Sequence, residues 1–253
     1  MKDHFHSTSF SIGDTKSALD MLRFGNDREG SSAINQLSAQ HGGSNIEANL
    51  WLPFAAKELR ISPNLRDYIV IPVPILISDM PNTNGDSLSI GELLRFDPNL
   101  GMQMFKTFRG KPTFLEHDNE DHTKAKGVIL DAFIRPLKGF GNGKYWKLVL
   151  LLAFDRTKDP MLAAAIASGE NNSYSLGFYF KSYTCSICNQ RFGQGGLKTP
   201  CSHTKPKRAP YRMSDGRLAY RRCEFANGFE TSAVANPAYV IAINSNAVDL
   251  SKF

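Results

Sequence analysis

The chain has 253 residues, of which 42% are hydrophobic and 21% are charged. This composition is typical of one large or two small globular domains with an ample apolar core, and it excludes a disordered tail and a mini-protein. The longest uninterrupted apolar run, Leu148 to Phe154, is far shorter than the roughly 20 residues that a membrane-spanning helix needs. The first residues show no cationic start followed by an apolar stretch, so we expect no secretory signal and a cytoplasmic location.

The charge of the chain is unevenly distributed. There are 30 basic and 24 acidic residues, which gives a formal net charge of +6 at pH 7. Residues 181–223 hold ten basic side chains and one acid, Asp215, so this segment is +9 and the remainder is −3. The segment also contains all the cysteines: Cys185, Cys188, Cys201 and Cys223. In a reducing compartment such a cluster binds metal more often than it forms disulfides.

Three parts of the chain differ in amino-acid composition. Residues 1–65 mix small polar and charged residues, and we predict an N-terminal extension that is peripheral or partly mobile. A β-rich domain is predicted over residues 66–245, followed by a C-terminal tail at 246–253. The β-rich domain begins with the β-branched run Tyr68–Ser78, whose prolines suit an edge strand or a strand with bulges.

Within this domain, the sequence predicts a helix over Ile90–Phe108 with a break at Asp97-Pro98. A second helix is predicted over Asp159–Gly169, with Asp159 as N-cap, Pro160 in the first turn and Gly169 as the stop. Alternating or β-branched runs predict the strands, which are Thr113–His117, Gly127–Ile134, Tyr145–Phe154, Asn171–Tyr183, Leu218–Phe225, Gly228–Val234 and Tyr239–Ile243.

The strand Asn172–Phe180 has one apolar and one small polar face, because side chains alternate along a strand. The apolar face carries Tyr174, Leu176, Phe178 and Phe180, and the polar face carries Ser173, Ser175, Gly177 and Tyr179. The glycine two positions after Ser175 leaves open space above the serine hydroxyl, where a substrate backbone could approach. The spacing alone favours the plainer alternative, a half-buried strand with solvent-facing serines.

His117 ends a predicted strand and enters a polar loop. Histidine side chains titrate near neutral pH and suit proton transfer, and a serine hydroxyl is a poor nucleophile until such a base removes its proton. His117 and Ser175 are therefore candidate partners across the sheet. Two alternatives remain open: His117 is a surface residue, or it binds a divalent metal together with Asp118, Asp121 and His122.

The cysteine spacing is that of a metal site: Cys185-x2-Cys188-x12-Cys201-x-His203. Two turns that each supply two soft ligands match tetrahedral zinc. We predict structural zinc in an inserted segment at residues 183–217, which is too polar to form a core of its own. Cys223 is an alternative to His203 as fourth ligand, although its place in a predicted strand suits a small buried residue. Four reduced thiols in a loop are the other interpretation.

In chain order, these features resemble one family. They are His117 at a strand end, the strand Gly127–Ala132, the helix ending at Ala167-Ser-Gly169, the triplet Ser175-Leu-Gly177 and the stretch Phe229–Tyr239. Together they are similar to the prohead (capsid maturation) proteases of tailed bacteriophages, which are related to herpesvirus assemblins. The resemblance covers residues 68–243. It implies an α+β fold, with a mainly antiparallel, assemblin-like β-barrel core surrounded by helices and the zinc-binding segment inserted in it.

The resemblance also implies an activity. It is that of a serine endopeptidase that acts inside the phage procapsid, in the bacterial host cytoplasm, on scaffold and major capsid precursor proteins and on itself. By position, Ser175 would be the nucleophile and His117 the general base, whereas Ser173 lacks the glycine two residues later. Cleavage after glutamate is implied, with a small or aliphatic residue two positions earlier.

The third catalytic residue does not transfer from the family. The T-even branch places an aspartate on the helix before the histidine, but the equivalent stretch here, Gly101–Phe108, contains no acid. Glu230, Asp97 and Asp131 remain candidates. The third group orients the imidazole rather than taking its proton, so a displaced acid is compatible with the chemistry. The oxyanion donors are expected among backbone N–H groups near Leu176 and Gly177 or in another loop.

Two other functions compete with the protease. One is a non-catalytic zinc-ribbon protein that binds nucleic acid or capsid, because aromatic residues are interleaved with the basic charge of residues 181–223. These aromatic residues are Tyr183, Phe192 and Tyr211. The other is a metal-dependent nuclease that uses His117 and His122. In the protease, the basic segment would be a flap that contacts acidic scaffold, the capsid shell or DNA. Self-association is left open, and no membrane partner is expected.

Overall fold

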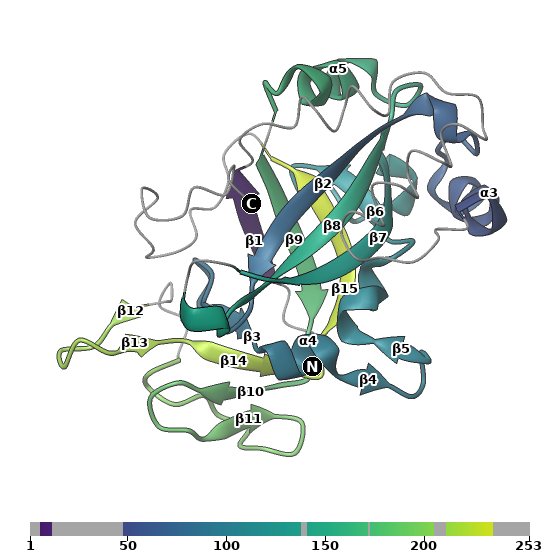
Figure 1. Cartoon of the computed structure of the whole chain (residues 1–253). Coiled ribbons are helices and arrows are strands. Elements are labelled where there is room, and N and C mark those ends of the chain that lie inside the picture. The colour runs from purple at the N-terminus through teal and green to yellow at the C-terminus, as the bar shows by residue number, and fades with distance from the viewer. Residues whose placement is uncertain (1–5, 12–47, 138–140, 172, 205–210, 235–253) are drawn as a thin grey trace.

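The computed structural model describes residues 6–11, 48–137, 141–171, 173–204 and 211–234. Over these residues the fold is α+β, with many strands and few helices (Figure 1). The main body is a seven-stranded sheet that curls into a half-barrel. Its strands, in spatial order, are β1 (His6–Ser11), β9 (Ser173–Tyr179), β15 (Asn227–Ala233), β6 (Pro112–Leu115), β7 (Gly127–Pro136), β8 (Trp146–Asp155) and β2 (Tyr68–Ile77).

The strand β2 behaves as its prolines predict. It is the last strand in the sheet order and pairs antiparallel with β8, with a register shift between Pro74 and Leu76. Proline has no N–H to donate to a ladder, so it is tolerated at a sheet edge or at a bulge. The prediction of an edge strand with bulges is confirmed.

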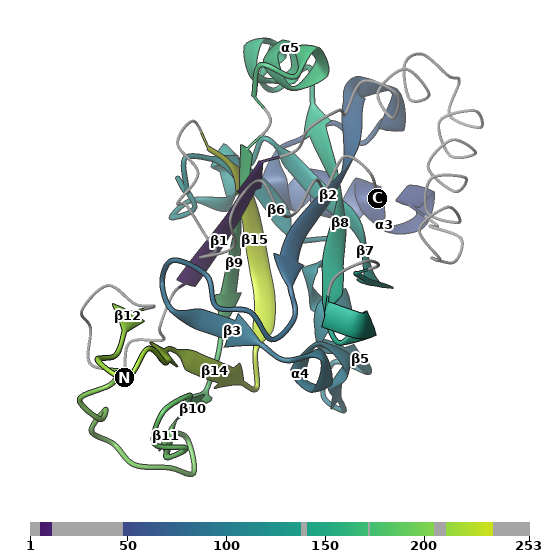
Figure 2. The same cartoon turned by 60° about the vertical axis from the view of Figure 1, so that its left-hand side comes forward.

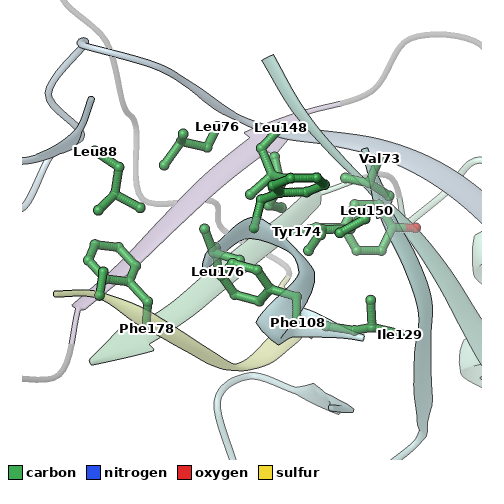
Figure 3. Packing of buried hydrophobic residues seen from close by; sticks show 14 of the residues in the cluster. Val73, Leu76, Leu88, Phe108, Ile129, Leu148, Leu150, Tyr174, Leu176 and Phe178 are labelled. Carbon is green, nitrogen blue, oxygen red and sulfur yellow. The ribbon is translucent and has the colours of Figure 1, made fainter. Parts of the chain in front are cut away.

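The inner face of the half-barrel holds the main apolar core (Figure 3). Side chains from β2, β8 and β9 meet there and are closed over by Phe108 from the 3₁₀ helix η2 (Met104–Phe108). The members of this core in Figure 3 include Val73, Leu148, Leu150, Tyr174, Leu176 and Phe178. The predicted alternation along β9 is therefore confirmed, because its apolar positions face the core.

A second apolar cluster covers the outer face of β7 and β8. The helix α3 (Ala48–Leu59) contributes Leu52 and Leu59, which pack with Val128 and Val149 of the two strands. Both faces of β8 are thus buried. This explains why its sequence is a continuous apolar run rather than an alternating one.

The first 65 residues contribute more to the domain than their polar texture suggests. The strand β1 pairs antiparallel with β9, and α3 packs on the outer face of the sheet. These two parts differ from the predicted peripheral extension. The physical reason is that β1 joins through backbone hydrogen bonds, which leave little trace in side-chain composition. The intervening residues 12–47 lie outside the described residues.

The predicted helix over Ile90–Phe108 is wrong in its middle. The chain instead forms α4 (Ile90–Leu94), a hairpin of β4 (Phe96–Asp97) and β5 (Met102–Gln103), and then η2. Gly101 has a φ of 64° and donates its N–H to Asp97 O, which turns the chain back. In contrast, α5 (Pro160–Ser168) is capped as predicted: the Asp159 side chain accepts from Leu162 N, and Gly169 ends the helix with a φ of 79°.

A smaller four-stranded sheet lies at one end of the half-barrel (Figures 1 and 2). Its order is β11 (Arg191–Gly193), β10 (Ser182–Cys185), β14 (Arg221–Glu224) and β3 (Asp86–Leu88). Because β3 pairs with β14 in parallel, the Cys/His segment (residues 183–217) is joined to the main domain by a shared sheet. Tyr183, Cys185 and Phe192 also belong to the main core cluster. In its described part, residues 183–204 and 211–217, the segment therefore has no core separate from this cluster.

Several short elements complete the described chain. They are η1 (Leu65–Asp67), η3 (His122–Lys124), η4 (Gly141–Gly143), β12 (Tyr211–Arg212) and β13 (Leu218–Ala219). The predicted strand at 239–243 and the tail at 246–253 lie outside the described residues. No helix within the described ranges is both long and apolar enough to cross a membrane.

Candidate active site and metal centre

His117 lies just beyond the end of β6, where the backbone turns sharply. Glu116 and His117 both have positive φ, 51° and 59°, which is uncommon for residues other than glycine. The turn is held by hydrogen bonds from Glu116 N to Ala233 O and from Asp118 N to Leu115 O. Such backbone strain gathers at functional sites, where the surrounding structure enforces it. The strained backbone is therefore one indication that His117 has a functional role.

Glu230 faces His117 because of a bulge in β15. Gly228 is opposite Phe178 of β9, yet Glu230 is opposite Gly177, so Phe229 is an extra residue in the ladder. Without this insertion, Glu230 would share the face of Gly228, which abuts Phe108 in the core. The bulge therefore moves the carboxylate to the outer face of the sheet. Bulges of this kind often re-aim a side chain next to an active site.

The two side chains form a contact between residues 113 positions apart. His117 Nδ1 lies 3.1 Å from Glu230 Oε1, and the Glu230 side chain is fully buried. The other carboxylate oxygen, Oε2, accepts a hydrogen bond of 2.7 Å from Ser232 Oγ. Next to an ionised carboxylate, which can only accept, the facing His117 nitrogen would carry the proton. The second ring nitrogen, Nε2, is then left as the basic one.

Ser175 lies on the same outer face, in the middle of β9. Its register partner on β15 is Ser232, and directly opposed residues point to the same side of a sheet. Its Oγ is buried and has no hydrogen-bond partner. A serine hydroxyl that is buried without a partner is unusual and calls for an explanation, which a reactive role would supply. The structure thus places Ser175, His117 and Glu230 at one face, with a direct contact between the last two.

Gly177 has a different role from the predicted one. We expected the glycine to leave open space for a substrate backbone. A Cβ built at this position would lie 2.6 Å from Glu230 Oε1 and 2.5 Å from Phe229 Cζ. The space beside Gly177 is therefore filled by Phe229 and Glu230, and a side chain at this position would have to displace one or both of them.

The other acidic candidates are engaged elsewhere. Asp97 lies in the β4–β5 turn, 3.6 Å from Arg95, and accepts from Asn99 N. Asp131 forms an ion pair of 2.8 Å with Lys106. Among the three candidates, Glu230 is the one in contact with the imidazole.

The expected oxyanion donors are also placed differently. Leu176 and Gly177 lie within β9, which pairs with β1 on one side and β15 on the other. Their backbone N–H groups are therefore directed at neighbouring strands. The rival serine, Ser173, is the first residue of β9, opposite Ser11 of β1.

The alternative metal site around His117 is not assembled within the described residues. Asp118 pairs with Lys124 at 2.8 Å, and Asp121 caps η3 by accepting from Thr123 N. His122 is 3.9 Å from Glu58. In the described ranges, the residues that could hold a metal ion together are the Cys/His group instead.

The predicted ligand atoms of the Cys/His segment converge. One ligand atom from each of Cys185, Cys188, Cys201 and His203 lies within 4.8 Å of the others. The sulfurs of Cys188 and Cys201 are 3.7 Å apart, too far for a disulfide. Two sulfurs bound tetrahedrally to one zinc ion at 2.3 Å would be about 3.8 Å apart. The group could therefore hold a metal ion of that kind.

The donor atoms themselves fit a metal. His203 Nδ1 is buried and has no hydrogen-bond partner, which suits a ring nitrogen facing a cation. The backbone N–H of Ile187 points at Cys185 Sγ at 3.4 Å. Burial raises the pKa of the Cys185 thiol. At Cys201 burial acts in the same direction, but hydrogen bonds from Thr204 and the His203 backbone outweigh it and lower the pKa.

Cys223 is not part of this group. Its thiol is buried and lies 3.5 Å from Asp86 Oδ1. Burial, and next the charge of Asp86, raise the pKa of Cys223 well above its usual value. The ligand atoms that lie within 4.8 Å of one another belong to Cys185, Cys188, Cys201 and His203, and Cys223 is not among them. Of the two predicted alternatives for the fourth ligand, the structure brings His203 to the cluster.

Several basic side chains of the basic segment, residues 181–223, are held by acids within the domain. Arg221 pairs with Asp86 at 2.7 Å, and Arg191 pairs with Glu224 at 2.9 Å. Arg217 pairs with Asp215 at 2.7 Å. The surface of the segment is therefore less positive than the count of basic residues suggests. Its exposed cations include Lys181, Lys198, Arg212, Arg217 and Arg222.

Sequence reasoning missed two residues that support these sites. Ser232 holds Glu230, and Thr204 lies 3.3 Å from Cys201 Sγ and 3.2 Å from the Tyr183 hydroxyl. Glu230 and Ser232 are two positions apart on one strand, so the sequence indicates that they share a face of the sheet. The bulge decides which face that is.

No protein-family model, curated protein or solved structure matches the chain.

Proposed function

We propose that this chain is a serine endopeptidase of the prohead protease type, with an assemblin-like barrel, which cleaves scaffold and capsid precursors inside a procapsid. The observation that carries the proposal is the His117–Glu230 pair of 3.1 Å, on the same face as the unpartnered Ser175 hydroxyl. A base oriented by a buried carboxylate is what a serine needs to become nucleophilic. The order of motifs along the chain, which resembles that family, supports the same function.

In this mechanism each of the three residues has one task. Ser175 Oγ attacks the carbonyl carbon of the scissile peptide, while His117 Nε2 takes the hydroxyl proton and then gives it to the leaving amine. Water then attacks the acyl carbon: His117 Nε2 takes a proton from the water and gives it to Ser175 Oγ as the acyl–oxygen bond breaks. Glu230 accepts from His117 Nδ1 throughout, so it holds the ring orientation and stabilises the imidazolium.

The metal proposed for the Cys/His segment is zinc, in a structural role. Three thiolates and one imidazole are a frequent structural zinc set, and four protein ligands leave no position open for substrate. The ion would hold residues 185–203 in place, since few of the side chains there are buried. Tyr183 connects the site to the core cluster, because its hydroxyl contacts Thr204.

A fluorophosphonate probe tests the active site without knowledge of the substrate. The probe phosphonylates an activated serine, with loss of fluoride, and mass spectrometry locates the adduct. We expect labelling at Ser175 in the intact protein and none in Ser175→Ala or His117→Ala. Ser173→Ala is the matched control on the same strand and should be labelled like the wild type. Labelling of Ser175 that persists in His117→Ala would contradict the proposed mechanism.

The substrate class needs a second experiment. Co-expression with the scaffold and major capsid precursors of a tailed phage should give cleavage after glutamate with the wild type and none with Ser175→Ala. If the serine is labelled but no precursor is cut, the chain is a serine hydrolase with a different substrate. Labelling and precursor cleavage thus separate the chemistry from the biological role.

A non-catalytic zinc-ribbon protein that binds nucleic acid or capsid is the second candidate. The exposed cations of the Cys/His segment favour it. Against it, Tyr183 and Phe192 are buried and stack on each other at 5.2 Å, so their rings are not available to bases. If this function holds, binding to double-stranded DNA falls steeply with salt and is lost with a chelator. Absent or salt-insensitive binding removes the candidate.

A further inference from the structure

Glu230 is held from two sides on the outer face of the sheet. On one side Ser232 Oγ donates to Oε2 at 2.7 Å, and on the other Gly177 provides the space that Oε1 occupies. The strand pairing determines both contacts, because Glu230 is opposite Gly177 and Ser232 is two residues further along β15. The hydrogen bond lies in the interior, since both Glu230 and Ser232 have no exposed surface.

A buried carboxylate with one partner could rotate about its last bond. In this case the two oxygens have different partners: Oε1 faces His117 Nδ1 and Oε2 faces Ser232 Oγ. The serine hydroxyl fixes the plane of the carboxylate and so fixes which oxygen meets the imidazole. Hydrogen bonds to an ionised group are shorter and stronger than neutral ones.

We propose that Ser232 is a positioning residue for the proposed protease, which acts on His117 through Glu230. This inference rests on the proposed function and adds a fourth member to the Ser175, His117 and Glu230 set. Ser232 is opposite Ser175 across the ladder, so one rung of the sheet carries both the nucleophile and the residue that orients the carboxylate. A small displacement of the base from its reactive geometry lowers the rate strongly.

The test compares Ser232→Ala with a matched control elsewhere. Ser182 in β10 is also a buried strand serine that contacts a glutamate, with 3.3 Å between its Oγ and Glu224 Oε2. Both alanine variants lose a serine–glutamate hydrogen bond. We expect Ser232→Ala to reduce the rate of Ser175 labelling by fluorophosphonate about tenfold, the effect of one hydrogen bond to a charged group. Ser182→Ala should leave the rate unchanged.

Two further variants keep the proposal falsifiable. Ser232→Thr retains the hydroxyl and should restore most of the labelling rate. Gly177→Ala pushes Glu230 from the opposite side and should slow labelling at least as much as Ser232→Ala. The proposal is overturned if folded Ser232→Ala is labelled at the wild-type rate, or if Ser182→Ala loses as much.

A spectroscopic readout separates this proposal from the proposed function. The proton on His117 Nδ1 should give a downfield imidazole resonance while it is bonded to the carboxylate, and Ser232→Ala should shift or broaden it. If wild-type Ser175 is never labelled but the resonance still responds to Ser232→Ala, the positioning role stands and the protease does not. If the resonance is the same in both proteins, the positioning role fails.

Discussion

The curled sheet and the Cys/His segment are stabilised by different means. The sheet has apolar side chains on its inner face and, over β7 and β8, on its outer face as well. Among the residues of the Cys/His segment whose side chains the structure describes, 186–204 and 212–217, few are buried, and the candidate ligand atoms lie close together. A change in the sheet should therefore affect the free energy of unfolding of the whole domain, whereas a change at the metal ligands should act first on the segment.

The two regions also share a boundary. Tyr183, Cys185 and Phe192 belong to the main core, and β14 pairs with β3. Arg221 lies at this boundary, with its guanidinium 5.9 Å from the Phe180 ring and 5.8 Å from the Tyr183 ring. The segment is therefore an extension of the domain, and a metal ion bound to the Cys/His group would take the place of the apolar contacts that its sequence lacks.

Loss of a metal ligand should have the largest effect. We expect Cys188→Ser to reduce the metal content from about one ion per chain to none, because three remaining ligands bind a structural ion far more weakly. Amide exchange should become fast over residues 186–204 but stay slow in β7 and β8. Metal analysis and hydrogen exchange measure the two effects. Cys223→Ser is the matched control and should keep its metal. Loss of metal from this variant would mean that Cys223, and not His203, is the fourth ligand.

Loss of the ion pair between Asp86 and Arg221 at this boundary should have the second-largest effect. Asp86→Ala leaves Arg221 without the carboxylate that pairs with it at 2.7 Å, and the loss of one partner from a buried pair costs about 3–5 kcal/mol. Chemical denaturation should show this as a loss in the unfolding free energy of the whole domain. Asp215→Ala removes an acid that pairs with Arg217 on the surface of the segment, and it should cause no measurable change. Equal effects of the two substitutions would mean that the boundary contributes nothing specific.

A change in the helix α5, which contributes no residue to the Cys/His group, should show the smallest effect. Asp159→Ala removes the N-cap of α5 and should cost about 1 kcal/mol in unfolding free energy, with an unchanged metal content. Burial raises the pKa of Asp159, but hydrogen bonds from Leu162 N and Lys126 outweigh it, so the folded pKa is lowered. The stabilisation is therefore present above the unfolded pKa and is lost as the pH falls through the folded pKa. Denaturation at neutral and acidic pH measures it, and a loss that is the same at both pH values would contradict this origin.

Much of the fold could be predicted from local patterns. The core face of β9, the buried run in β8 and the caps of α5 follow from periodicity and from residues with fixed conformational preferences. The candidate metal ligands were predictable for a similar reason, because Cys185 and Cys188 share one turn and their spacing constrains the geometry. The helix predicted over Ile90–Phe108 with a break at Asp97-Pro98 was wrong in its middle, where a hairpin replaces it, because a tight turn at Gly101 carries little periodic signal.

The tertiary structure decided what the local patterns left open. Three acids were candidates to orient His117, and only the bulge at Phe229 places Glu230 on the same face as Ser175. Cys223 lies beside Asp86 and outside the cluster, whereas the fold brings His203 to Cys185, Cys188 and Cys201. The sequence by itself determined which side chains are apolar, reactive or able to bind metal. Which of them meet depends on strand register and on contacts more than 100 positions apart, because a shift of one residue reverses the face of every side chain that follows.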